Sequence, residues 1–123
     1  MPATEELADF IRSHFRSVWS LELLLHLKRD PERVWSTAEL VEGIQASQRV
    51  VATSLENLAA GGLIVMESDD KVRYGPAGGE LAGLINEIEA LYAKKADAVR
   101  RLIVRGAASE LSAFADAFRL RRE

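Results

Sequence analysis

The stretch WSTAELVEGIQASQRVVATSLENLAAGGLIV, residues 35–65, decides the fold. A first helix begins at Ser36, and Glu39 three residues later completes the pattern of a capping box. Ser47 is a candidate N-cap for a second helix over residues 47–60. Gly61-Gly62 ends that helix, because glycine readily adopts the left-handed conformation found after many helices. Two short helices joined by a turn of about three or four residues are typical of a helix-turn-helix.

A β-hairpin is predicted immediately after the two glycines. The expected strands are Leu63–Met66 and Lys71–Tyr74, and residues 67–70 form the tip. A hairpin that follows the second helix directly is typical of a winged helix-turn-helix. The alternative interpretation is a generic helical hairpin packed on a core.

The rest of the chain is predicted to be helical. Apolar residues recur at helical spacing in an N-terminal helix and again in a core helix from about Ser17 to Arg29. After the breaker segment 75–79, a long helical pattern weakens at residues 94–97, where we expect a kink or break. The predicted fold is therefore mainly α with a small β-hairpin, a winged helix-turn-helix with an extra N-terminal helix and a C-terminal helical extension. The expected parts are residues 1–16 (N-terminal helix), 17–76 (winged domain) and 77–123 (C-terminal helices, for dimerisation).

Composition limits the classes of protein to consider. The 123 residues have a net charge of −3 and include no cysteine, which excludes disulfides and thiol chemistry. The longest apolar run, Leu23-Leu24-Leu25, is too short to cross a bilayer. The acidic N-terminus lacks the basic start of a signal peptide. We therefore expect a cytoplasmic protein without membrane contact.

The order of elements resembles the winged-helix transcription regulators, and most closely the MarR-type arrangement. The resemblance covers nearly the whole chain and rests on residues 35–40, residues 47–58, Gly62-Leu63-Ile64, Asp70 and Arg73. It implies that the second helix of the motif enters the major groove of double-stranded DNA. It also implies that the wing lies on the phosphate backbone and that terminal helices of two subunits form a homodimer.

The predicted function is DNA-binding transcriptional regulation. The helix 47–60 is expected to lie in the major groove and the wing, residues 66–74, on the backbone. Residues 34–76 nevertheless contain three basic and six acidic residues, although DNA affinity depends on phosphate neutralisation by Lys and Arg. The alternative is a winged-helix module that binds a protein partner and no DNA. The candidate base contacts are Arg49, Thr53 and Asn57, and the candidate phosphate contacts are Ser47, Gln48, Lys71 and Arg73.

A homodimer is predicted because the apolar stripes of the terminal helices are longer than one small winged domain is expected to cover. The alternative is that these helices fold back on their own domain. The candidate interface residues are Leu7, Phe10, Ile11, Leu81, Ile85, Ile88, Tyr92, Val99, Leu102, Leu111, Phe114 and Phe118.

Catalytic chemistry finds little support in the sequence. His14 and His26 have no carboxylate or second histidine at metal-ligand spacing, and Gly78-Gly79 does not begin a phosphate-binding loop. We expect no enzyme, no metal and no cofactor. Trp19, Trp35 and Tyr92 are candidates for lining an effector pocket, and the alternative is that they belong to the core.

Overall fold

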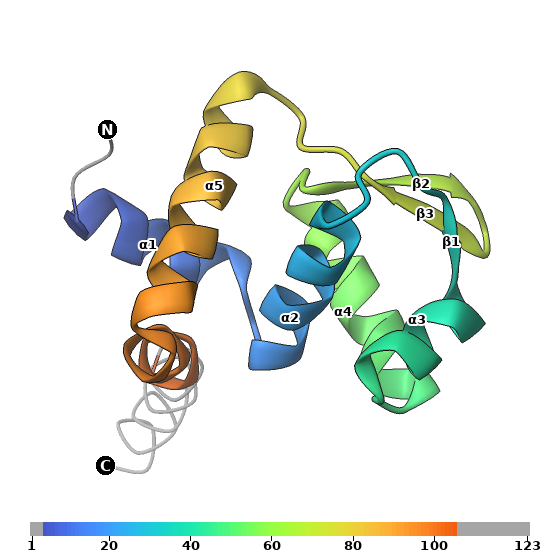
Figure 1. Ribbon diagram of the computed structural model, residues 1–123, viewed down its shortest axis with the longest axis horizontal. Helices are drawn as coiled ribbons and strands as arrows, with labels where there is room; N and C mark the ends of the chain where they lie inside the picture. The colour runs from blue at the N-terminus through green and yellow to red at the C-terminus, as the bar shows by residue number, and fades with distance from the viewer. Residues whose placement is uncertain (1–3, 106–123) are drawn as a thin grey trace, which may run out of the picture.

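The computed structural model describes residues 4–105, which form a mainly α-helical protein with a small antiparallel sheet (Figure 1). Element order and sheet are compatible with a winged-helix shape. A further helical segment over residues 96–105 follows the last labelled helix. The helices are α1 (Thr4–His14), α2 (Val18–Lys28), α3 (Thr37–Ile44), α4 (Gln48–Ala60) and α5 (Gly79–Lys94), and the strands are β1 (Trp35–Ser36), β2 (Ile64–Ser68) and β3 (Lys71–Tyr74).

The predicted helix starts of the central motif are confirmed. The Glu39 amide donates to Ser36 Oγ (3.2 Å) and the Ser36 amide donates to Glu39 Oε1 (2.8 Å), which is the expected capping box of α3. The Val50 amide donates to Ser47 Oγ (3.1 Å) at the start of α4. Gln45 ends α3 in the left-handed region, with φ of 56°. The chain therefore turns sharply between the two helices.

The sheet pairs a third, two-residue strand with the predicted hairpin. The strand order is β1-β3-β2, so the two-residue strand β1 pairs with the outer side of the hairpin. Trp35 lies opposite Val72 in this antiparallel ladder. The hairpin itself is longer than expected, because β2 continues to Ser68 and the pairing shifts register between Met66 and Ser68. The β1 pairing connects the start of α3 directly to the wing.

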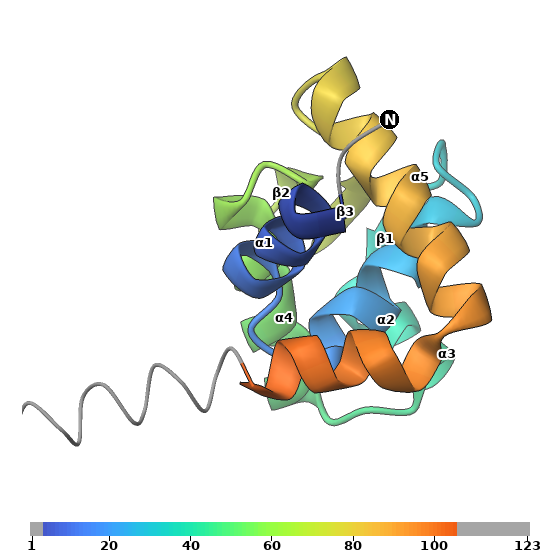
Figure 2. The same ribbon diagram turned by 90° about the vertical axis from the view of Figure 1, so that its left-hand side faces the viewer.

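The core is built around α2, whose apolar side chains extend around most of its circumference. Leu21, Leu23, Leu24 and Leu27 are all fully buried. A helix that is apolar on all sides must be covered on all sides. Helices α3 and α4 pack against α2, and α1 and α5 pack against each other. The segment 96–105 passes beneath α2 (Figure 2).

The expectation that one chain leaves the terminal apolar stripes exposed is wrong for the described residues. Ile88 and Val99 are 0% exposed within a single chain. The reason is that the terminal helices fold back on their own chain, where α5 packs against α1, as the alternative interpretation proposed. Of the candidate dimer residues, Phe10, Ile11, Ile85, Ile88 and Val99 are buried, Leu7, Leu81, Tyr92 and Leu102 are half-buried against the core, and Leu111, Phe114 and Phe118 lie outside the described residues.

The predicted break in the long helix is confirmed. Helix α5 ends at Lys94, and its C-cap Lys95 leaves the helical region with φ of −137° and ψ of 55°. The chain then resumes as a helix at residue 96 and runs in a new direction (Figure 2). Val99 and Ile103 anchor this second segment in the core, with exposed fractions of 0% and 1%.

Candidate nucleic-acid interface

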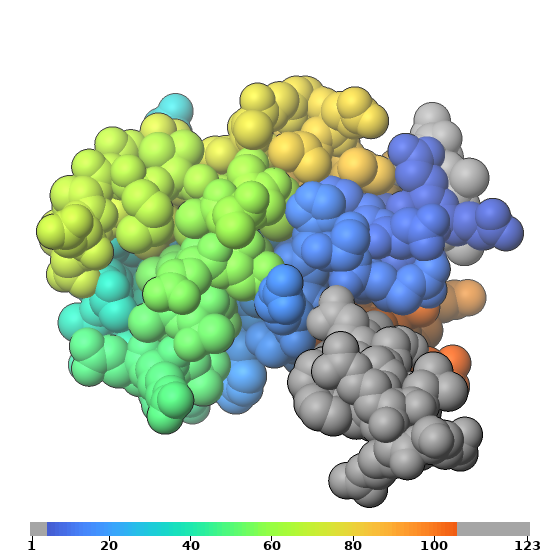
Figure 3. All heavy atoms as spheres, turned by 180° about the vertical axis from the view of Figure 1, so that it is seen from behind, coloured from blue at the N-terminus to red at the C-terminus, as the bar shows by residue number. Residues whose placement is uncertain are grey.

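Helix α4 has one buried face and one exposed face. Val51, Leu55 and Leu58 are buried, and the positions on the opposite side of the helix are exposed to solvent. Viewed from behind, α4 and α1 form much of one broad face of the protein (Figure 3). We call the exposed positions of this helix the α4 outer face, which consists of Gln48, Arg49, Ala52, Thr53, Glu56 and Ala60.

Asn57 is not part of the α4 outer face, because it is half-buried and its side chain has a structural role. Its Nδ2 donates to the His14 carbonyl oxygen (3.0 Å), and its Oδ1 accepts from the Arg16 amide (3.1 Å). Both ends of the side-chain amide are therefore used to hold the link between α1 and α2. Reading adenine uses both the oxygen and the nitrogen of the side-chain amide, so a base contact by Asn57 would compete with the bonds that hold this link.

The two basic residues predicted in the wing differ in their freedom. Arg73 Nε donates to Glu67 Oε1 (2.8 Å), and Arg73 Nη1 donates to the Tyr74 carbonyl oxygen (3.3 Å). Its charge is therefore largely matched within the hairpin. The Lys71 side chain is exposed and forms no hydrogen bond or ion pair within residues 4–105, although its charge acts on the neighbouring Asp70. Of the two predicted phosphate contacts in the wing, Lys71 is the better placed.

Two of the acidic residues near α4 have structural roles. The Thr37 amide donates to Asp70 Oδ1 (3.2 Å), which ties the hairpin tip to the start of α3. Hydrogen bonds from Thr37 hold the pKa of Asp70 below its usual range. The pKa of Glu39 is lowered first by the hydrogen bond from the Ser36 amide and then by Arg33, which lies 2.7 Å away. Part of the negative charge of residues 34–76 is therefore required by capping.

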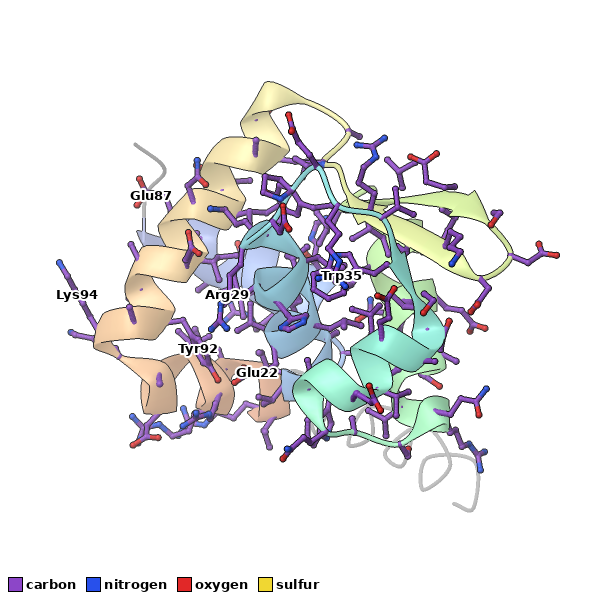
Figure 4. All side chains as sticks on the ribbon, turned by 45° about the vertical axis from the view of Figure 1, so that its right-hand side comes forward. Glu22, Arg29, Trp35, Glu87, Tyr92 and Lys94 are labelled. Carbon is purple, nitrogen blue, oxygen red and sulfur yellow. The ribbon has the colours of Figure 1, made fainter. Side chains whose placement is uncertain are left out.

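A cleft of about 640 Å³ opens between α2, the end of α3 and α5. Trp19 (42% exposed) and Tyr92 both line it, as the pocket hypothesis expected, whereas Trp35 is buried outside it. The Tyr92 hydroxyl donates to Glu22 Oε1, and Arg100 Nε donates to the Tyr92 oxygen (3.2 Å). Figure 4 shows Tyr92 and Glu22 directed toward each other from α5 and α2. Burial, and then the bond to Glu22, raise the pKa of Tyr92.

His26 lines this cleft, and its ring lies tilted against that of Trp35. Their ring centroids lie 4.9 Å apart, and the Arg33 guanidinium lies 3.6 Å from the centroid of the Trp35 ring. Within residues 4–105, His26 Nε2 and Trp35 Nε1 are buried without a hydrogen-bond partner. Burial lowers the pKa of His26, and the nearby positive charges of Arg29 and Arg33 lower it further. Both effects favour the neutral form of the imidazole.

Comparison with known proteins gave no family assignment, because no family model, curated protein or solved structure matches the chain. Among the described residues, none of the helices combines the length and apolar character needed to span a membrane. The same part of the chain contains no group of three or more His, Asp or Glu side chains that could hold a metal ion.

Proposed function

We propose that this chain is a cytoplasmic winged-helix regulator that binds double-stranded DNA through the α4 outer face. The supporting observation is the arrangement of α3, α4 and the hairpin β2–β3 around one core, with α4 exposed along one side. A capped helix with a buried apolar face and a free polar face is suited to enter a major groove, which admits a single helix. The short turn at Gln45 fixes α3 across the start of α4.

Each remaining candidate on α4 has a defined role in this proposal. Arg49 pairs with guanine, because its guanidinium matches the two acceptors of that base. Thr53 lies one turn further along and contacts a base edge or methyl group. Ser47 and Gln48 lie at the N-terminus of α4, where backbone amides and the helix dipole favour a phosphate. Lys71 provides a phosphate contact from the wing.

Selection from a random duplex library tests this function. The unaltered protein should enrich a sequence motif, and Thr53→Ala should enrich a degenerate version of it at the contacted position. Ala52→Ser, also on the α4 outer face, is the matched control because it removes no group able to make a base contact in this proposal. Recovery of unenriched sequence from every round contradicts the proposal.

A second candidate function is supported by a groove beside the wing. A groove of about 230 Å³ lies between α4, the start of α3 and β2, and Leu55, Ala59 and Met66 line it. Glu56 and Asp69 also line it, so it suits an apolar side chain with a positive charge nearby. In this proposal the chain binds a basic protein segment instead of DNA.

Charge reversal distinguishes the two functions. The substitutions Glu56→Lys and Asp69→Lys avoid Asp70, whose capping contact with Thr37 is structural. If the surface binds phosphates, the double variant binds DNA more tightly than the unaltered chain. If it binds a basic segment, the variant loses a partner that the unaltered chain retains after nuclease treatment.

Association of two chains remains a proposal. Its support is now limited to Leu111, Phe114 and Phe118 in the sequence of the C-terminal region. Light scattering at micromolar concentration tests it directly. A dimeric mass that Phe114→Asp converts to a monomeric mass supports association, and a monomeric mass for the unaltered chain contradicts it.

A further inference from the structure

The positive charge of this protein is concentrated away from the α4 outer face. Residues 94–105 contain five basic residues and one acidic residue, whereas residues 34–76 contain three and six. Duplex DNA has about one negative charge per 1.7 Å of its axis, and cations that meet it release counterions. The described surface best suited to phosphates is therefore the C-terminal helical segment rather than the wing.

Four of these five cations are free to meet a partner. Arg100 is the exception, because it donates to Asp97 (3.1 Å) and to the Tyr92 oxygen. Lys94, Lys95, Arg101 and Arg105 are exposed, and within the part of the chain that the structure describes their side chains form no hydrogen bond or ion pair. We call Arg101 and Arg105 the basic ridge, because Lys94 and Lys95 lie at the other end of the segment, where α5 ends. Figure 4 shows Lys94 directed away from the protein.

The helical segment that carries the basic ridge is anchored in the core on its opposite side. Val99 and Ile103 bury the opposite side of the segment in the core. Arg101 and Arg105 are four residues apart, so they lie on one side of the helix with Cβ atoms about 5–6 Å apart. Guanidinium groups bind phosphates with paired hydrogen bonds. Because the planar guanidinium is pre-organised, an Arg side chain loses less entropy for each hydrogen bond it forms.

The segment also runs toward the side of the protein on which α4 lies. In Figure 2 it crosses beneath α2 from the α5 side and ends on the side that α1 and α4 share. Figure 3 views that side directly and shows α4 and α1 next to each other on it. A duplex lying against α4 therefore passes on the same side of the protein as the end of this segment.

We propose that the basic ridge is a second DNA contact, which binds backbone phosphates flanking the base pairs contacted by α4. This proposal rests on the proposed function for the position of the duplex. It explains how a chain with a net-negative helix-turn-helix region obtains phosphate contacts beyond the one that Lys71 provides from the wing. The ridge adds affinity that is independent of sequence, and α4 adds selectivity.

DNA fits this surface better than a lipid membrane does. A helix that lies on a membrane inserts an apolar face among the lipids. Here the apolar face of the segment is already buried in the core, and among its described residues only Val104 is a large exposed apolar side chain. The ridge therefore offers charge without an apolar face to insert.

The test compares two double variants with the same change in net charge. Arg101→Gln with Arg105→Gln removes the ridge arginines, and Lys94→Gln with Lys95→Gln is the control, because these exposed lysines lie at the α5 end of the segment. Affinity for a short random-sequence duplex is measured from about 50 to 200 mM salt. The ridge variant should lower the slope of log K against log salt by about 2 and weaken binding roughly tenfold at the lower salt concentration, whereas the control should change neither by more than about a quarter of that.

The outcomes separate this proposal from the proposed function. If random duplex is bound with the predicted loss of slope but no sequence is enriched, the basic ridge is supported and the proposed function fails. Equal slopes for the ridge variant and its control overturn the ridge proposal, even if α4 selects a sequence. Binding to vesicles of anionic lipid that the ridge variant loses, without any effect on duplex binding, also overturns it.

Discussion

Replacing Asn57 by alanine separates a structural role from a DNA contact. In the structure the Asn57 side chain donates to the His14 carbonyl oxygen and accepts from the Arg16 amide, at 3.0 and 3.1 Å. Asn57→Ala removes both bonds and frees the link between α1 and α2 from α4. The two backbone groups lie near the surface, so water can replace part of what they lose.

The expected cost follows from these two bonds. Each hydrogen bond contributes about 0.5–1.5 kcal/mol net, and the higher helix propensity of alanine returns roughly 0.5 kcal/mol. We therefore expect a loss of about 1–2 kcal/mol in the free energy of unfolding and a Tm lower by roughly 4–8 °C. In urea the midpoint should fall while the m-value stays unchanged, because the buried surface is the same.

Thr53→Ala is the matched control, since Thr53 lies one turn earlier on the same helix and is exposed. We expect its unfolding free energy to stay within about 0.5 kcal/mol of the unaltered chain. In DNA binding measured well below the Tm, the order reverses: Thr53→Ala loses selectivity and Asn57→Ala keeps it. The reasoning is refuted if Asn57→Ala leaves the Tm unchanged and alters the preferred bases.

Two further predictions concern the core and pH. Ile88→Asp should unfold the chain, at a cost above about 4 kcal/mol, because Ile88 is 0% exposed within one chain; Ala90→Asp on the exposed side of α5 is the control, and a folded monomeric Ile88→Asp protein would contradict the fold-back of α5. The pKa of His26 is lowered from 6.5 in the folded chain, so the unfolded chain binds more protons and stability should decline as the pH falls below about 6.5, until the lowered pKa is passed. Urea midpoints measured across this range should show the decline, and His26→Gln should abolish it; an unchanged decline in His26→Gln assigns it to other groups.

Local signals in the sequence predicted the helix boundaries well. The capping residues Ser36 and Ser47 and the break near Lys95 each act through the backbone within a few residues, so sequence spacing alone reveals them. The pairing of β1 with the hairpin was not predicted, because two residues are too few to show the alternating pattern of a strand. Its partner lies 35 or more residues later in the chain.

Long-range contacts account for what the sequence did not predict. Helical periodicity placed Asn57 at the edge of the exposed face. Its partners are backbone groups in a link more than 40 residues earlier in the chain, and periodicity carries no information about such distant contacts. The apolar stripes around Ile88 were correctly identified as buried surface but assigned to a second chain. The stripe alone does not show which surface covers it. In the structure that surface is the core of the same chain, because α5 folds back on it. The sequence does show the basic residues of the segment 94–105. It does not show that Arg100 is paired with Asp97 while Arg101 and Arg105 point to solvent.

The most direct test of sequence-selective DNA binding by α4 is the effect of Arg49→Ala on one pair of affinities. Fluorescence anisotropy at fixed salt would compare an enriched duplex with a scrambled duplex of the same composition. The account predicts that Arg49→Ala weakens binding to the enriched duplex by about 1–3 kcal/mol, roughly 5- to 150-fold, and reduces its advantage over the scrambled duplex. Arg29→Ala, with the same change in charge, should leave that advantage intact. Equal affinities of the unaltered protein for the two duplexes, or an advantage that Arg49→Ala does not change, would contradict the account.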